Sequence, residues 1–101
     1  MTTTQILTPA QLQEHIDRLP RMDIAHLPAP LEEMPRLTER LGGPKIWIKR
    51  EDMTGLAFGG NKARHYEFEM PHVQNEGYDV MINIMDYHSN NAHMTAAAAN
   101  K

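Results

Sequence analysis

The sequence contains no cysteine, no long apolar run and no cluster of basic residues. The missing cysteine excludes disulfides and thiolate metal sites, and it fits a cytoplasmic protein. No apolar stretch approaches the roughly 20 residues of a membrane-spanning helix, and the opening residues lack the features of an export signal. A net charge of −3 without a basic patch argues against nucleic acid or an anionic membrane as partner. We therefore expect a cytoplasmic chain.

The chain has 101 residues, of which 41% are hydrophobic and 23% charged. These proportions are ordinary for a soluble protein and predict one small domain with one modest core. The eight methionines are high for this length, and we expect them to fill irregular gaps in that core.

Residues 1–44 are expected to form a helix followed by a proline-rich arm. Thr8 is the predicted N-cap and Pro9 the first residue of a helix that ends at Pro20. Four prolines between positions 20 and 35 then predict an extended arm that takes no part in the core. A second short helix is expected from Glu32 to Leu41, where glycines stop it.

Residues 45–101 are expected to form the start of an α/β domain. Lys45–Lys49 alternates and is rich in β-forming residues, which predicts a strand. A loop with three glycines leads to a helix that begins at Lys62 and stops at Gly77. Pro71 lies inside this helix and is expected to kink or split it.

Two further elements follow. Tyr78–Met85 is expected to be a mostly buried strand, and Ala92–Lys101 to begin an alanine-rich helix. We expect the apolar face of this last helix to have no cover within the chain. The order of helix, strand and helix predicts α/β architecture.

The first motif of chemical interest is Gly59-Gly60-Asn61-Lys62. Glycines allow the backbone to approach a ligand closely, and the N–H groups at a helix start face outward. A lysine at this place can do chemistry. The alternative is an ordinary solvated lysine.

The second motif is His88-Ser89-Asn90-Asn91, between the predicted strand and the next helix. Ligands of α/β sheets bind at such places, where helical N–H groups favour an anion. The alternative is that Ser89 or Asn90 is only the N-cap. His88 is either a proton shuttle or a side chain that faces solvent.

Together the two motifs resemble the pyridoxal-phosphate enzymes of the D-cysteine desulfhydrase and 1-aminocyclopropane-1-carboxylate (ACC) deaminase family, which have the tryptophan synthase β-like fold type II. Gly-Gly-Asn-Lys is the most specific mark, preceded by Ile-Lys-Arg-Glu-Asp-Met-Thr-Gly-Leu. Ser-Asn-Asn-Ala-His-Met-Thr-Ala follows after the predicted helix and strand. The resemblance runs from about Ala25 to the end and is closer to the desulfhydrase branch.

The resemblance implies a site for pyridoxal 5'-phosphate. Lys62 would form the Schiff base with the cofactor aldehyde and carry protons. Asn61 would bind the cofactor beside it, and Asn90 would hydrogen-bond the phenolic oxygen of its ring. His65 stands where the family has a phosphate-binding lysine, so its contribution would depend on pH.

The resemblance also implies how a small amino-acid substrate would be held. Ser89 would act in catalysis near the substrate carboxylate or α-carbon, and Asn90 and Asn91 would bind the substrate with the following helix N–H groups. The implied reaction is a β-elimination that gives a 2-oxo acid and ammonia. Asp86, Tyr87 and His88 replace glycines and a glutamine of the family, which affects the choice of substrate.

The resemblance covers only the N-terminal third of a family member, so the implied fold is a partial fold type II architecture with an arm, a strand, a glycine-rich loop and a helix–strand–helix unit. The remainder of the site would come from missing polypeptide or from the partner subunit of an oligomer. The chain is then either a fragment or a small subunit of a lyase or deaminase.

Two other hypotheses remain. The chain is a non-catalytic remnant or docking module that binds a full-length enzyme of the family, or it binds a metal through histidines. His88 and His93 are five apart and share no helix face, while His65 and His72 could share one but have no evident third ligand.

Overall fold

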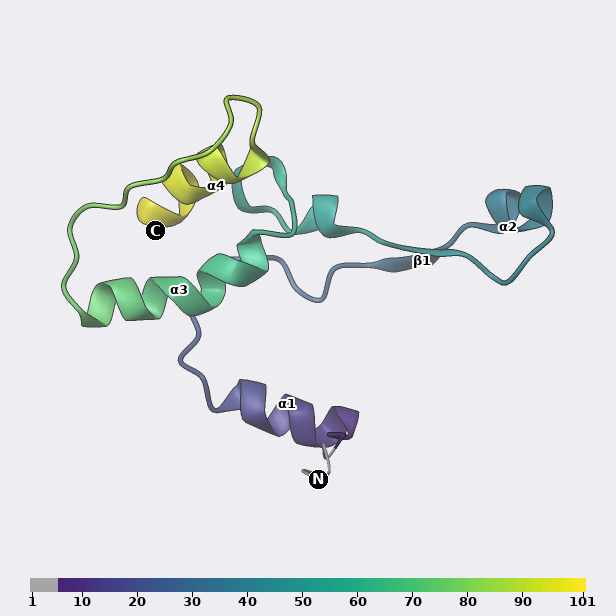
Figure 1. Ribbon diagram of the computed structural model, residues 1–101, viewed down its shortest axis with the longest axis horizontal. Coiled ribbons are helices and arrows are strands. Elements are labelled where there is room, and N and C mark those ends of the chain that lie inside the picture. The colour runs from purple at the N-terminus through teal and green to yellow at the C-terminus, as the bar shows by residue number, and fades with distance from the viewer. Residues whose placement is uncertain (1–5) are drawn as a thin grey trace, which may run out of the picture.

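The computed structural model describes residues 6–101. Helices α3 (Ala63–Asn75) and α4 (Asn90–Ala99) lie together, a thin ribbon extends from them to α2 (Pro35–Leu41), and α1 (Pro9–Asp17) lies apart (Figure 1). The radius of gyration is 17.7 Å, whereas a compact domain of this length would have about 13 Å. The described chain is therefore open rather than globular.

Helix α1 begins as expected. Thr8 is its N-cap: its hydroxyl accepts the Gln11 N–H at 3.3 Å, and its own N–H donates to the Gln11 side chain at 2.9 Å. The helix ends at Asp17, before Pro20, and none of its residues is buried. A helix of this length without packing is marginal in water.

The arm between α1 and the ribbon contributes to the core, so the prediction that it takes no part was wrong. Ala25 and Ala29 are buried, and the Ala25 N–H donates to the carboxylate of Glu67 at 3.1 Å. The guanidinium of Arg21 also binds this carboxylate, with Nε 2.6 Å from Oε2. Small alanine side chains allow the extended backbone to lie directly against α3.

The ribbon is an antiparallel pair, β1 (Leu31–Glu33) with β2 (Trp47–Lys49), in which Glu32 lies opposite Ile48. The predicted strand is confirmed as β2, but the predicted helix begins at Pro35 instead of Glu32. Glu32 and Glu33 belong to β1 and pair with β2, and Met34, which precedes the proline, disfavours the helical region. Gly42 ends α2 in the left-handed conformation, as expected.

Helix α3 is continuous across Pro71 rather than split there. Proline cannot donate the backbone bond to the carbonyl four residues earlier, which here belongs to Glu67. The N–H of Met22, in the arm, donates to that carbonyl at 2.7 Å instead. The arm therefore compensates for the bond that the proline removes.

The segment 78–85 is extended but is neither a paired strand nor buried, which corrects the prediction of a mostly buried strand. Val80, Ile82 and Ile84 are 70%, 84% and 92% exposed. Backbone groups of a strand need a neighbouring strand, and residues 6–101 provide none here. Met81 packs against the core, so one face of the segment is partly covered.

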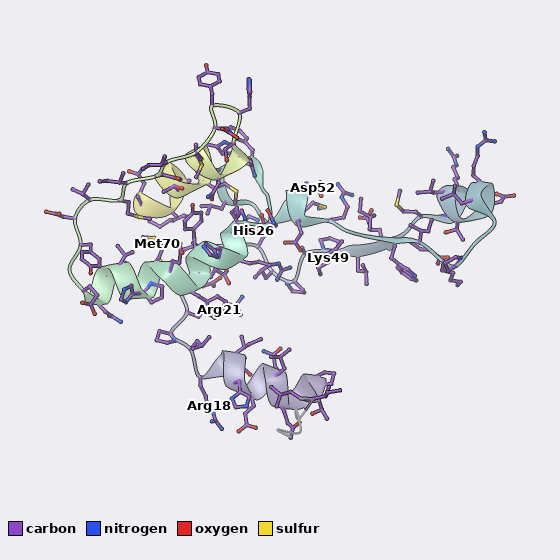
Figure 2. The ribbon with its side chains drawn as sticks, viewed as in Figure 1. Arg18, Arg21, His26, Lys49, Asp52 and Met70 are labelled. Carbon is purple, nitrogen blue, oxygen red and sulfur yellow. The ribbon has the colours of Figure 1, made fainter. Side chains whose placement is uncertain are left out.

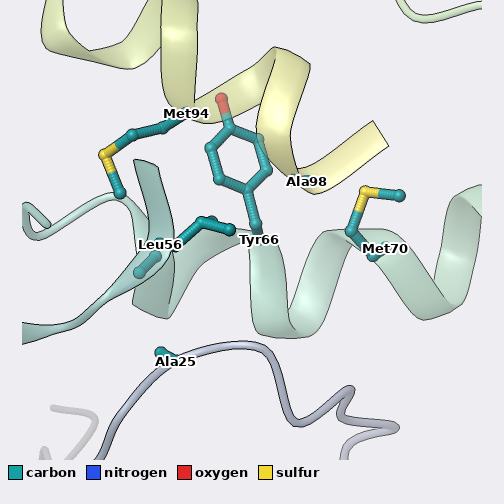
Figure 3. Packing of buried hydrophobic residues seen from close by; sticks show 7 residues of the cluster. Ala25, Leu56, Tyr66, Met70, Met94 and Ala98 are labelled. Atoms are coloured by element: carbon teal, nitrogen blue, oxygen red, sulfur yellow. The ribbon is translucent and has the colours of Figure 1, made fainter. Parts of the chain in front are cut away.

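The core lies between α3, α4 and the loop before α3 (Figure 3). Met94 and Ala98 of α4 are fully buried, beside Tyr66 of α3 and Leu56 of the loop. The prediction that the apolar face of the alanine-rich helix has no cover was therefore wrong. Among the residues described, no helix combines the length and the apolar character needed to cross a membrane.

Candidate functional site

The loop before α3 has two tight turns, Glu51–Met53 and Leu56–Phe58, and ends in the pair Gly59–Gly60. A Cβ at Gly59, where φ is +85°, would lie 1.8 Å from the carbonyl oxygen of Asp52. Only glycine fits at this position. Figure 2 shows Asp52 and His26 near the point where the ribbon meets the helices.

The side chain of Thr54 binds this glycine pair from inside the loop. Its hydroxyl is fully buried with the rest of the residue, donates to the Gly60 carbonyl at 2.8 Å, and accepts the Gly60 N–H at 3.0 Å. The same N–H also points to the carbonyl of Glu51 at 2.8 Å. Both polar backbone groups of Gly60 are therefore satisfied inside the loop.

The two predicted motifs meet where Gly60 packs against Asn90, the first residue of α4. The Asn90 side-chain nitrogen donates to the Gly59 carbonyl at 3.3 Å, and a Cβ at Gly60 would lie 2.3 Å from that nitrogen. The structure thus brings the Gly-Gly-Asn-Lys turn to the N-terminus of α4. Glycine is favoured here because Gly60 has a φ of +138° and the amide group of Asn90 lies close to its backbone.

Lys62 directly precedes α3 and has an exposed side chain. Its backbone carbonyl accepts the N–H groups of His65 and Tyr66, but its side-chain amine makes no hydrogen bond or ion pair with any residue from 6 to 101. The amines of two other lysines do have partners. Lys49 Nζ donates to the carbonyl of Ala29, and Lys45 Nζ lies 3.6 Å from Glu33 Oε1. The Lys62 amine therefore has no competing partner within the described chain.

A bidentate ion pair fixes the first turn of α3 to the loop. Arg64 Nε and Nη2 lie 2.7 and 2.9 Å from the two carboxylate oxygens of Glu51. The hydrogen bonds from Arg64 hold the pKa of Glu51 below its ordinary value, against a smaller opposing effect of burial. Arg50 lowers the pKa of Asp52 in the same way, again by donating hydrogen bonds.

Asn61, Lys62 and His65 line one open depression of about 550 Å³ on the outer side of α3. His65 Nε2 lies 2.8 Å from Glu69 Oε1, one turn further along the helix. A smaller hollow of about 200 Å³ joins His65 to Asn91. Three of the predicted site residues are therefore neighbours, and His65 connects them to the start of α4.

Hydrogen bonds from its N-cap and from α3 hold the start of α4. Ser89 is the N-cap, since its hydroxyl accepts the Asn91 N–H at 3.3 Å. Tyr66 donates from its hydroxyl to the Asn91 side-chain oxygen at 2.6 Å, and the same hydroxyl lies 2.5 Å from Thr95 Oγ1. His88 is exposed. The Ser89 hydroxyl hydrogen and the Asn91 side-chain nitrogen have no partner within residues 6–101.

Sequence reasoning missed Thr54, the Tyr66 hydroxyl and the pair Glu51–Arg64. Tyr66 lies on the buried face of α3, and its hydrogen bonds to α4 depend on how the helices pack. A threonine before a glycine-rich loop is a weak turn signal. Across residues 6–101, no group of three or more histidine or carboxylate side chains is arranged to hold a metal ion.

Comparison with known proteins finds relatives along most of this chain. Over 87 residues it is 44% identical to proteins named D-cysteine desulfhydrase from Salmonella paratyphi B and Salmonella newport, a match that covers 86% of this chain and 26% of each relative. A solved structure described as an ACC deaminase homologue matches with a TM-score of 0.83 and 32% identity, over 93% of this chain and 28% of that one. No protein-family model matches.

The structure is a part of an α/β fold in which a lysine-bearing glycine turn packs on the start of a second helix. The chain is homologous to the N-terminal region of the D-cysteine desulfhydrase and ACC deaminase family, which confirms the resemblance expected from its motifs. It spans about a quarter of the relatives that it matches, rather than the expected third. The match is also longer than the stretch from Ala25 onward.

Proposed function

We propose that this chain carries the cofactor lysine of a pyridoxal-phosphate-dependent lyase or deaminase that acts on a small amino acid. The observation that carries the proposal is the position of Lys62. Its exposed, unpartnered amine follows a glycine turn that packs against Asn90. The homology to D-cysteine desulfhydrase supports the same reading.

The side chains around this turn fit pyridoxal 5'-phosphate. When bound, this cofactor supplies an aldehyde that bonds amines and a conjugated ring that stabilises negative charge on carbon. Lys62 offers the primary amine, and Asn61 and His65 line the same depression. The side-chain nitrogen of Asn90, which here donates to the Gly59 carbonyl and to the sulfur of Met94, would exchange the sulfur for an oxygen of the cofactor ring. A protonated His65 would donate from Nε2 to Glu69 and from Nδ1 to the phosphate.

The start of α4 fits the carboxylate of the substrate. The side-chain nitrogen of Asn91, which has no partner among residues 6–101, is a donor at the N-terminus of a helix, where an anion is favoured, and Asn90 lies beside it. Ser89 keeps its hydroxyl hydrogen to donate, since the oxygen accepts the cap bond. In the proposed β-elimination, Lys62 takes the proton of the substrate α-carbon, and the β-substituent leaves with its bonding electron pair. Water then hydrolyses the released enamine to a 2-oxo acid and ammonia.

We propose further that a second polypeptide, equivalent to the rest of the relatives, completes the site. The segment 78–85 presents an alternating apolar face and backbone groups without a neighbouring strand. A strand from another polypeptide, added beside this segment, would pair with its backbone groups and help to cover its apolar face. The chain spans only 26% of the relatives' length, which leaves enough polypeptide for such a strand.

Association can be tested by mixing the chain with the part of the ACC deaminase homologue that it does not match. Wild-type chain is expected to form a complex in which the amides of residues 79–85 are protected from hydrogen exchange. Ile82→Asp should weaken this complex at least tenfold, whereas Tyr87→Asp, at a 96% exposed position outside the segment, should not. Self-association, or no complex at all, would contradict this partner.

Cofactor binding is tested by absorbance of the completed assembly with pyridoxal phosphate. The yellow absorbance of a lysine-bonded cofactor is expected for wild type and for Lys45→Ala, and it should vanish in Lys62→Ala. An unchanged spectrum in Lys62→Ala would refute the assignment. Absence of the absorbance in a stable wild-type complex would favour the docking module.

A further inference from the structure

We propose that Thr54 is the positioning residue of the cofactor lysine: its buried hydroxyl sets the conformation of the Gly59–Gly60 turn and so the place of the Lys62 amine. The inference rests on the proposed function of Lys62. It assigns to Thr54 a role that the motif reasoning did not reach.

The Thr54 hydroxyl binds both polar backbone groups of Gly60. It has one hydrogen, which it donates to the Gly60 carbonyl at 2.8 Å rather than to the Glu51 carbonyl at 3.2 Å. Its oxygen accepts the Gly60 N–H at 3.0 Å. A single side-chain oxygen therefore binds both backbone groups of one residue, which fixes the orientation of the peptide planes on either side of Gly60.

The conformation of Gly60 determines where the Lys62 backbone lies. Gly60 has a φ of +138°, a value that few residues other than glycine adopt. It is two residues before Lys62, and no regular hydrogen-bonded element lies between them. Without the two hydrogen bonds from the Thr54 hydroxyl, the backbone of this glycine could rotate and move Lys62 relative to Asn90.

The surroundings of Thr54 show that its side chain is held in turn. The residue is fully buried, and its backbone carbonyl accepts the N–H of His26 from the arm at 2.8 Å. The hydroxyl thus cannot exchange its partners for water. Thr54→Val, which keeps the shape and removes the hydroxyl, would leave the Gly60 carbonyl without its donor.

The test compares Thr54→Val with Thr54→Ser in the completed assembly. Two quantities are measured: the rate at which pyridoxal phosphate and borohydride attach a covalent label to Lys62, and the amide hydrogen exchange of Gly60. The loss of one buried hydrogen bond corresponds to about a fivefold change or more. Thr54→Val is therefore expected to slow labelling of Lys62 and to speed exchange at Gly60 by at least that factor, with labelling of Lys45 unchanged.

Thr54→Ser keeps the hydroxyl and loses the methyl group, so its labelling of Lys62 and its exchange at Gly60 should stay near wild type. If the methyl group mattered instead, through packing, Thr54→Ser would change both rates. If Thr54→Val does not fold, Thr54→Ala against Thr54→Ser makes the same comparison. Wild-type labelling and exchange in Thr54→Val would overturn the proposal. Labelling of wild-type Lys62 no faster than of Lys45 would instead refute the proposed function, while the exchange at Gly60 would still decide the role of Thr54.

Discussion

The loop–helix junction, residues 51–62, and the segment 78–85 each lead into or out of a helix, but they differ in how many of their groups have partners in the described chain. At the junction, Thr54, Glu51 and Asn90 satisfy the backbone of Gly59–Gly60. In the segment, three apolar side chains are at least 70% exposed. The junction finds its partners within the described chain, with Thr54 and Glu51 close in sequence and Asn90 lying 31 residues from Gly59. The segment depends on polypeptide outside residues 6–101.

The largest effect is expected from Gly59→Ala, which would break the junction. The new Cβ would lie 1.8 Å from a backbone oxygen, at a φ of +85°. We expect a loss of about 3 kcal/mol or more in the free energy of unfolding, measured by urea denaturation. Gly43→Ala is the control, because a Cβ there meets nothing within 4 Å, and it should change stability by less than about 0.5 kcal/mol.

A smaller loss is expected from Tyr66→Phe. This change removes the hydroxyl that donates to Asn91 at 2.6 Å and leaves a partly buried acceptor unpaired, at a cost of about 1 kcal/mol. Urea denaturation measures it, with Tyr87→Phe as the exposed control. Equal stabilities of the two variants would show that the contact between α3 and α4 contributes nothing.

A still smaller effect is expected from acid. Because Arg64 holds the pKa of Glu51 below its ordinary 4.5 in the folded chain, their interaction stabilises the fold fully above that pH and is lost as the pH falls through the lowered pKa. The pair is partly exposed, so the contribution should be below about 1 kcal/mol. Unfolding measured against pH should show this slope in wild type and not in Glu51→Gln; identical slopes would contradict the role of the pair.

The smallest effect on the chain itself is expected from Ile84→Ser. Its side chain is 92% exposed, so its removal should change the free energy of unfolding by less than about 0.5 kcal/mol. The same change should weaken association with the completing polypeptide. A large loss of stability in the isolated chain would mean that the segment is packed within it, and the comparison would fail.

The features that could be predicted from the sequence are those set by near neighbours. Thr8, Gly42 and Ser89 cap their helices because the groups that they bind lie within four residues. The strand β1 was missed because only its pairing with β2, some sixteen residues later, makes it a strand. The continuity of α3 at Pro71 was missed for the same reason, since its compensating donor, Met22, is far away in sequence.

The candidate site also has features that the sequence predicts and features that depend on the fold. The resemblance implies that Lys62 and Asn90 share one cofactor site, but it did not predict that Asn90 contacts the carbonyl of Gly59. The hydroxyl of Thr54 was not anticipated either, since its two bonds to Gly60 exist only when the loop is folded. The burial of segment 78–85 was predicted from its apolar character, but burial also requires a cover.

The most direct test is a peptide map of the completed assembly after pyridoxal phosphate and borohydride treatment. The account predicts one covalent cofactor group, on the peptide that contains Lys62, with Lys45 and Lys49 unmodified. A label spread evenly over the lysines, or absent from Lys62, would contradict it.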